Sequence, residues 1–168
     1  MKTIPQPQTL ADVTDYSESI EDFGLLLREW IHFIQRRDVS NRPELSKAIG
    51  KSPRLLATRF KQGEVADAYL GAYAEWIADK AKIKRPEWVR SPERVLQKPW
   101  FADEARASLL VLSPASFRQR NLFTIPESVI KLRRGRPRVS EQIKKEKARE
   151  RNQRYRARVR EWIKKGRN

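Results

Sequence analysis

Residues 41–63 of the chain read NRPELSKAIGKSPRLLATRFKQG. Pro43 suits the first turn of a helix, where its missing amide proton costs no hydrogen bond, and Gly50 can take the left-handed conformation that ends a helix. Ser52 suits the N-cap of a second helix, which closes at Gly63. The stretch therefore predicts two short helices joined by a glycine turn. The side chains expected to face inward are Leu45, Ala48, Ile49, Leu56 and Phe60.

The segment LSKAIGKS, residues 45–52, resembles the helix-turn-helix of the lambda-repressor-like (Xre-type) family of regulators and antitoxins, which often read Leu-Ala-x-x-Leu-Gly-x-Ser at this point. The resemblance implies that a helix over 52–61 lies in the major groove of duplex DNA. Arg54 would then read guanine and Thr58 a base edge, while lysines contact phosphates. The alternative is two packed helices without a DNA role. The predicted contacts are Lys51, Ser52, Arg54, Thr58 and Lys61.

The flanking sequence predicts more helices and no confident strand, so the predicted fold class is all-α. Apolar residues recur at helical spacing from Ser19, a suitable N-cap, to Arg37, and again over 65–81. We expect 1–16 to be a flexible lead-in and 17–83 to be a helix-turn-helix domain.

Residues 84–132 are rich in proline and tryptophan, and the prolines predict short helices. This region resembles a segment of antitoxin-like proteins, which implies a toxin or another protein as partner. It forms either a protein-interaction module or a part that completes the core. Its expected helices are 91–97, 102–112, 115–120 and 126–132. The residues that carry the resemblance are the runs Pro86-Glu87-Trp88, Ser91 to Arg94, Lys98 to Phe101 and Ser113 to Arg120.

Positive charge is concentrated at the end of the chain. Residues 133–168 hold 16 Lys and Arg against 4 Asp and Glu, so they supply +12 of the net charge of +16. The run at 134–138 resembles an AT-hook, whose core is Arg-Gly-Arg-Pro. Such a segment lies in the narrow minor groove of A·T-rich DNA. The predicted contacts are Arg133, Arg134, Gly135, Arg136, Pro137 and Arg138.

Residues 140–165 predict a basic helix, capped by Ser140 and supported by a Glu150–Arg154 pair one turn apart. The spacing of Asn152 and Arg160 is similar to that in bZIP basic regions, but no leucine heptads follow, which excludes that class. The segment is either a phosphate-binding arm or a solvated run of charge. Its apolar stripe is expected to dock on the body or on a partner: Tyr155, Val159, Trp162 and Ile163.

These observations predict a DNA-binding protein, a regulator or antitoxin, without enzymatic activity. The chain has no cysteine and one histidine, His32, and it carries no glycine-rich phosphate loop. We therefore expect no cofactor and no metal. No apolar run is long enough to span a membrane, so we expect a cytoplasmic, nucleoid-associated protein, with a homodimer as one option. The alternatives are an RNA- or ribosome-associated protein and an accessory DNA-binding subunit of a phage or mobile-element complex.

Overall fold

The computed structural model describes residues 6–38, 40–124 and 141–165, and within the last range the side chains of 142 and 145–156. The chain divides into two compact units, Met1–Gly135, here called the body, and Arg136–Asn168. The described residues are mostly helical, which confirms the all-α class.

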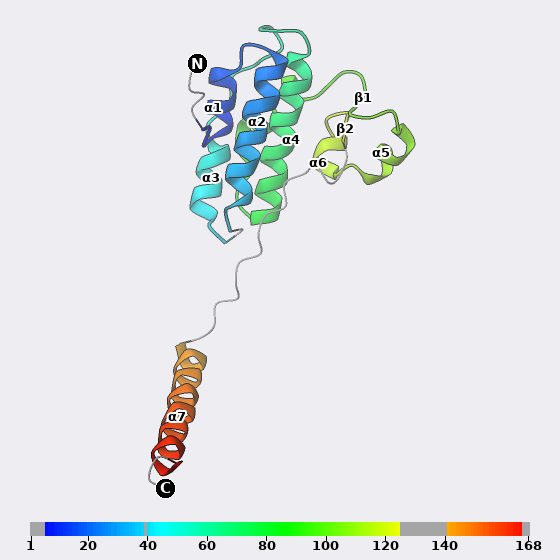
Figure 1. The fold of residues 1–168 in the computed structure, drawn as a ribbon. Coiled ribbons are helices and arrows are strands. Elements are labelled where there is room, and N and C mark those ends of the chain that lie inside the picture. Colours follow the sequence, from blue (N-terminus) through cyan, green and yellow to red (C-terminus); the bar gives the residue numbers. More distant parts are fainter. Residues whose placement is uncertain (1–5, 39, 125–140, 166–168) are drawn as a thin grey trace. The chain divides into compact units, whose positions relative to one another are not determined.

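Four helices form the core of the body: α1 (Leu10–Tyr16), α2 (Ile20–Gln35), α3 (Arg42–Gly50) and α4 (Gly63–Ala81). Figure 1 shows α2 and α4 side by side, with α1 and α3 along one flank. The central helix is α4, whose alanines and glycines allow neighbours to approach on several sides. The largest fully buried side chains of these helices are Trp30, Leu10, Ile34, Leu45, Ile49, Leu70 and Ile77.

The predicted helices over 19–37, 43–50 and 65–81 are confirmed, and Ser19 caps α2 by accepting the amide of Asp22. The flexible lead-in predicted for 1–16 is wrong for its last seven residues, which form α1. Thr9 and Asp12 make a reciprocal capping box at the start of α1, and Leu10 and Val13 are buried. The lead-in was predicted because this helix is too short to show a clear period.

The predicted helix over 52–61 is absent. Gly50 is still helical and does not take a left-handed conformation, and Lys51 leaves α3 in an extended conformation (φ −72°, ψ 129°). Residues 51–62 then run as an irregular segment with turns, here called the α3–α4 strap. The helix-turn-helix geometry is therefore not formed, although Leu56 is buried as expected.

The described part of the proline-rich region, 84–124, packs on α4 and completes the core. It contains the 3-10 turns η1 (Glu87–Arg90) and η2 (Pro92–Arg94) and the helices α5 (Arg106–Leu112) and α6 (Ala115–Arg118). The expected helix over 91–97 is reduced to the 3-10 turn η2. The helices expected over 102–112 and 115–120 are present as α5 and α6, which are shorter than predicted. Two short parallel strands, β1 (Trp100–Phe101) and β2 (Leu122–Phe123), pair Trp100 with Leu122, which the sequence pattern did not indicate.

The second unit contains α7 (Glu141–Lys165), which confirms the basic helix predicted over 140–165. The expected helix over 126–132 and the AT-hook-like run at 133–138 lie outside the described residues, as does the proposed cap Ser140.

Candidate nucleic-acid interface

The predicted DNA contacts of the body lie on or beside the α3–α4 strap and are exposed: Lys51, Ser52, Arg54, Thr58 and Lys61. They do not line one helical face, because the strap is not a helix. Two of them already have an acidic neighbour. Asp15 of α1 lies 3.0 Å from Arg54 and 3.7 Å from Lys51, so a phosphate would have to compete with this carboxylate.

The strap is held by a buried ion pair between α4 and η2. The carboxylate of Asp67 accepts the backbone amides of Leu56 and Ala57 at 3.0–3.1 Å and an N–H of Arg94 at 2.7 Å. Arg94 also donates to the carbonyl of Pro53. These bonds satisfy strap groups that a helix would have satisfied internally, so the extended path costs no buried hydrogen bond.

A second buried ion pair lies two turns further along α4. Arg120 donates to Glu75 at 2.5 Å and to the carbonyls of Ser116 and Val89. Arg85 contacts the other oxygen of Glu75 at 2.7 Å. The two pairs together fix η2 and the residues after α6 to one helix.

Gly71 lies on α4 midway between the two carboxylates, and its missing side chain makes room for both arginines. A Cβ added there would lie 2.7 Å from Nε of Arg120 and 3.2 Å from Cβ of Arg94. Asp67, Gly71 and Glu75 are spaced by four, so they share one face of the helix. Asp67 and Glu75, eight residues apart on the face of α4 that also carries Gly71, are the sequence signal that could have indicated buried ion pairs.

Both buried carboxylates are engaged by other groups: Asp67 by Arg94 and two backbone amides, and Glu75 by Arg120 and Arg85. Burial raises the pKa of Asp67 and lowers the pKa of Arg94, in each case against the attraction between the two groups. Among the residues that the structure describes, no group of three or more acidic or histidine side chains is arranged to hold a metal ion.

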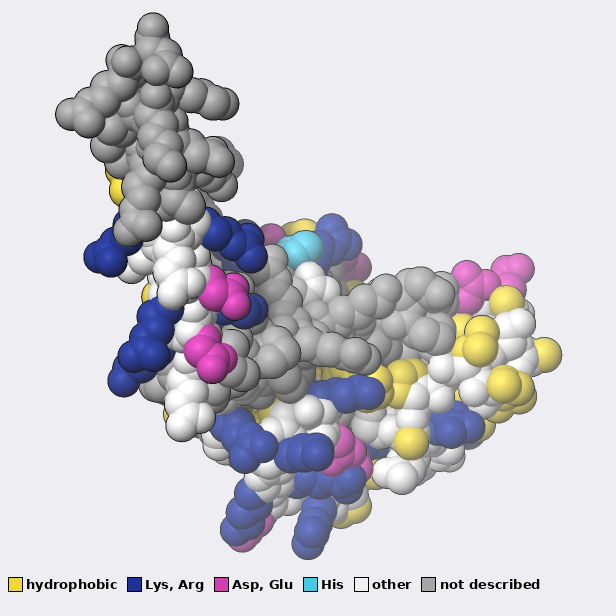
Figure 2. Space-filling view, turned by 90° about the horizontal axis from the view of Figure 1, so that it is seen from below, with side chains coloured by type: hydrophobic (Ala, Val, Ile, Leu, Met, Phe, Trp, Pro, Cys, Tyr) yellow, Lys and Arg dark blue, Asp and Glu magenta, His cyan; other side chains and the backbone are white. Residues whose placement is uncertain are grey.

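The cations of α7 are arranged differently. From Lys145 to Arg156 the helix carries six Lys and Arg and two Glu, and almost every side chain is exposed. Figure 2 shows dark blue side chains on both flanks of the coloured part of this helix. Within the described residues, the one ion pair of α7 is the predicted pair Glu150–Arg154, at 4.0 Å.

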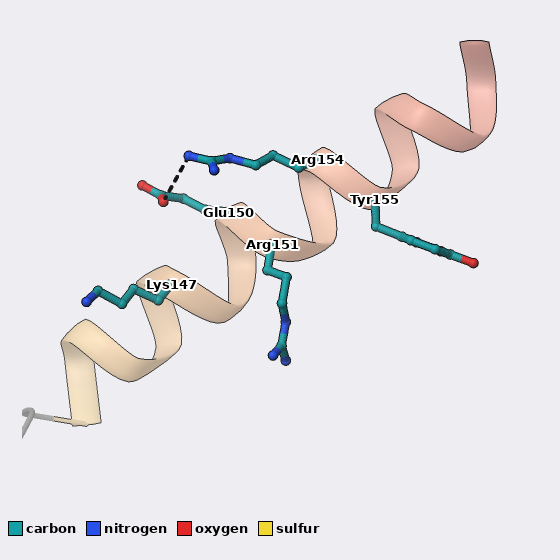
Figure 3. Close-up of a pocket in the computed structure, with 5 residues that line it drawn as sticks. All are labelled: Lys147, Glu150, Arg151, Arg154 and Tyr155. Carbon is teal, nitrogen blue, oxygen red and sulfur yellow. Dashed lines mark ion pairs between the residues drawn. The ribbon is translucent and has the colours of Figure 1, made fainter. Parts of the chain in front are cut away.

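One face of α7 forms an open hollow of about 450 Å³ between its side chains (Figure 3). Its lining residues follow the spacing i, i+3, i+4, i+7 and i+8: Lys147, Glu150, Arg151, Arg154 and Tyr155. Tyr155 is 69% exposed, and its ring points away from Arg151 and Arg154 (Figure 3).

The body also exposes an apolar surface on α5. Leu110, Val111 and Leu112 are 48, 75 and 57% exposed, and yellow side chains gather at this end of the body in Figure 2. In the described part of the chain, no helix has the length and the apolar character needed to cross a membrane.

Comparison of the chain with known protein families, with curated proteins and with solved structures finds no match.

Proposed function

We propose that this protein binds duplex DNA and that α7 supplies the main contact with the phosphate backbone. The observation that carries the proposal is the charge of α7. Its 25 residues hold 11 Lys and Arg against 4 Glu, and the described cations are exposed. Duplex DNA carries one negative charge per about 1.7 Å of helix axis, and each phosphate contact releases a condensed counterion.

The composition of α7 from Lys145 to Arg156 also favours a polyanion over an apolar partner. Its described residues show no continuous apolar stripe, because Ala148 and Tyr155 are the only apolar side chains from Lys145 to Arg156. A helix that is polar on all sides gains little from packing. Like charges one turn apart, such as Lys145–Arg149 and Lys147–Arg151, destabilise it slightly. Phosphates would relieve this repulsion, so we expect the helix content of the protein to rise on DNA binding.

The helix over 52–61 forms no part of this proposal, since that segment is not helical. Sequence reading by Arg54 and Thr58 depended on that helix. The regulator role depended on the same resemblance, whereas the antitoxin role also depended on the resemblance of residues 84–132 to antitoxin-like proteins. What remains from the strap is a set of exposed polar groups that could add phosphate contacts beside Asp15.

The test is a salt titration of duplex binding by the full chain and by the triple variant Lys147→Gln, Arg151→Gln, Arg154→Gln. If all three side chains contact phosphates, the slope of log affinity against log salt should decrease by roughly 2.7, about 0.9 for each contact. The matched control is Arg90→Gln, Lys98→Gln, Arg118→Gln. It removes the same charge from exposed positions of the body.

Equal losses in the two triple variants would mean that only net charge matters, and the role of α7 would be rejected. An unchanged slope in the α7 variant would reject it as well. A circular dichroism titration with the same duplex measures the expected rise in helix content.

Tyr155 favours a second candidate, binding of single-stranded nucleic acid. An exposed aromatic ring on a helix rich in arginine offers a surface on which a base can stack. Replacing Tyr155 by leucine keeps the charge of α7 and removes the ring. A selective loss of single-strand affinity would favour this candidate over the duplex.

A further inference from the structure

A second hollow, on the body, lies between α3 and residues 84–88. Its volume is about 450 Å³, and it is shallow and open to solvent. It combines an indole, two hydroxyls and two cations with one carboxylate, and we call it the α3 hollow. Its lining residues are Ser46, Gly50, Ser52, Lys84, Arg85, Pro86, Glu87 and Trp88.

The indole of Trp88 is held in a fixed orientation. Its Nε1 donates to the carbonyl of Ile49 at 3.0 Å, in the last turn of α3. The guanidinium of Arg94 lies 5.2 Å from the ring centroid, and Arg94 is itself fixed by Asp67. The ring is therefore partly buried and preorganised, and it still lines the hollow. A fixed aromatic ring is a good surface for stacking a nucleobase.

The polar residues of the hollow suit a phosphate group. Lys84 is exposed and, among the described residues, makes no ion pair, whereas Arg85 is engaged by Glu75 and Asp79. Ser46 and Ser52 are exposed hydroxyls on the opposite wall. Glu87 is the one acid of the lining and would repel an anion, so Lys84 and the serines are the groups that remain for a phosphate.

We propose that the α3 hollow binds a nucleoside monophosphate moiety, with the base on Trp88 and the phosphate on Lys84 and Ser52. The moiety could belong to a free nucleotide or to the unpaired end of a strand, since both present the same chemistry. The proposal goes beyond duplex binding by α7 and involves none of the residues of α7.

The experiment titrates the full chain with adenosine monophosphate and follows tryptophan fluorescence, which a stacked base should quench. Lys84→Ala should weaken binding about tenfold or more, because a charged hydrogen bond is lost. Trp88→Phe should remove most of the quenching. Trp76→Phe is the control for the fluorescence, and Lys98→Ala, an exposed lysine outside the hollow, is the control for charge.

A third variant tests the hollow without removing any contact. Gly50 lines it, and a Cβ added there meets nothing within 4 Å, so Gly50→Leu should fold and fill the hollow. Gly24→Leu, at an equally open position on α2, is the matched control. We expect Gly50→Leu to abolish nucleotide binding and Gly24→Leu to retain it.

A short duplex with one unpaired adenosine, compared with the same duplex blunt, separates the two sources of the moiety. Binding of the free nucleotide alone would assign the hollow to a small molecule. A preference for the unpaired end that Gly50→Leu removes would assign it to a strand end.

The proposal is overturned if neither probe binds, if Gly50→Leu binds as well as Gly24→Leu, or if Lys84→Ala and Lys98→Ala behave alike. The adenosine monophosphate titration tests the α3 hollow, and the salt titration with duplex tests α7. Either proposal can therefore fail while the other holds.

Discussion

Two buried arginines of the body and the exposed arginines of α7 are the same residue in two different environments. Arg94 and Arg120 are 2 and 5% exposed, and each is bonded to a carboxylate of α4 and to backbone carbonyls. The described arginines of α7 are exposed, and Glu150 supplies the one acidic partner found there. A buried guanidinium must be compensated by fixed partners, whereas an exposed one remains available to a mobile anion.

This comparison shows why counting charges over a whole chain is a poor guide to a binding surface. Three quarters of the net charge lies in residues 133–168, and the arginines that hold the body together contribute nothing to an anion site. Substitutions at buried positions, each compared with a substitution at an exposed or open position, therefore test this difference between the two groups of arginines.

Replacing Arg94 by methionine should have the largest effect on stability. The change keeps most of the apolar stem but leaves Asp67 buried without its partner and frees the carbonyl of Pro53. Breaking a buried pair in this way costs about 3–5 kcal/mol. Urea unfolding measures the loss. Arg118→Met, at an exposed position, should change the free energy of unfolding by no more than about 0.5 kcal/mol. Similar losses in the two variants would remove the distinction between buried and exposed arginines.

Adding a methyl group at Gly71 should have an intermediate effect. Its Cβ would lie 2.7 Å from Nε of Arg120, which cannot move freely because its guanidinium is bonded to Glu75 and two carbonyls. Overpacking of this kind costs about 1–3 kcal/mol. Gly24→Ala, where the added atom meets nothing within 4 Å, should instead stabilise α2 by up to about 1 kcal/mol. Thermal unfolding measures both variants. A lower melting temperature for Gly71→Ala and a higher one for Gly24→Ala would support the prediction, and changes in the same direction would contradict it.

Alkaline pH should produce the smallest effect, through Tyr73. Burial raises the pKa of this phenol above its usual value, so near pH 10 the unfolded chain releases a proton that the folded chain keeps. The contribution of Tyr73 to the free energy of unfolding is therefore fully present below about pH 10. Above that pH it falls, by at most about 1.4 kcal/mol per pH unit.

Tyr73→Phe should reduce this slope in urea unfolding from about pH 9 to 11. Burial raises the pKa of Tyr69 too, so part of the slope should remain in Tyr73→Phe. A slope that Tyr73→Phe leaves at its original value would contradict the prediction.

Elements with a clear local pattern could be predicted from the sequence. The helices α2, α4 and α7 follow from apolar spacing or from runs of good helix formers, and Ser19 caps α2 as its type predicts. The pair Glu150–Arg154 also follows from spacing alone. In each case the residues that decide the structure lie within about one turn of each other.

The strap and the α3 hollow could not be predicted in this way. Ser52-Pro53 is a good local start for a helix, but the amides of Leu56 and Ala57 bind Asp67, and the carbonyl of Pro53 binds Arg94, 41 residues away. Trp88 reaches Ile49 across 39 residues. Local propensity amounts to a few tenths of a kcal/mol per residue, and a buried hydrogen-bonded ion pair can outweigh it.

The sequence by itself therefore determined the helical class and the concentration of positive charge in α7. Both depend on composition and on neighbours along the chain. Only the tertiary structure decided that residues 51–62 are not a recognition helix and that two arginines are buried beside Gly71. It also decided that Ser52 and Lys84 share a hollow with Trp88. These features depend on contacts between residues far apart in sequence, which form only when α4 brings the segments together.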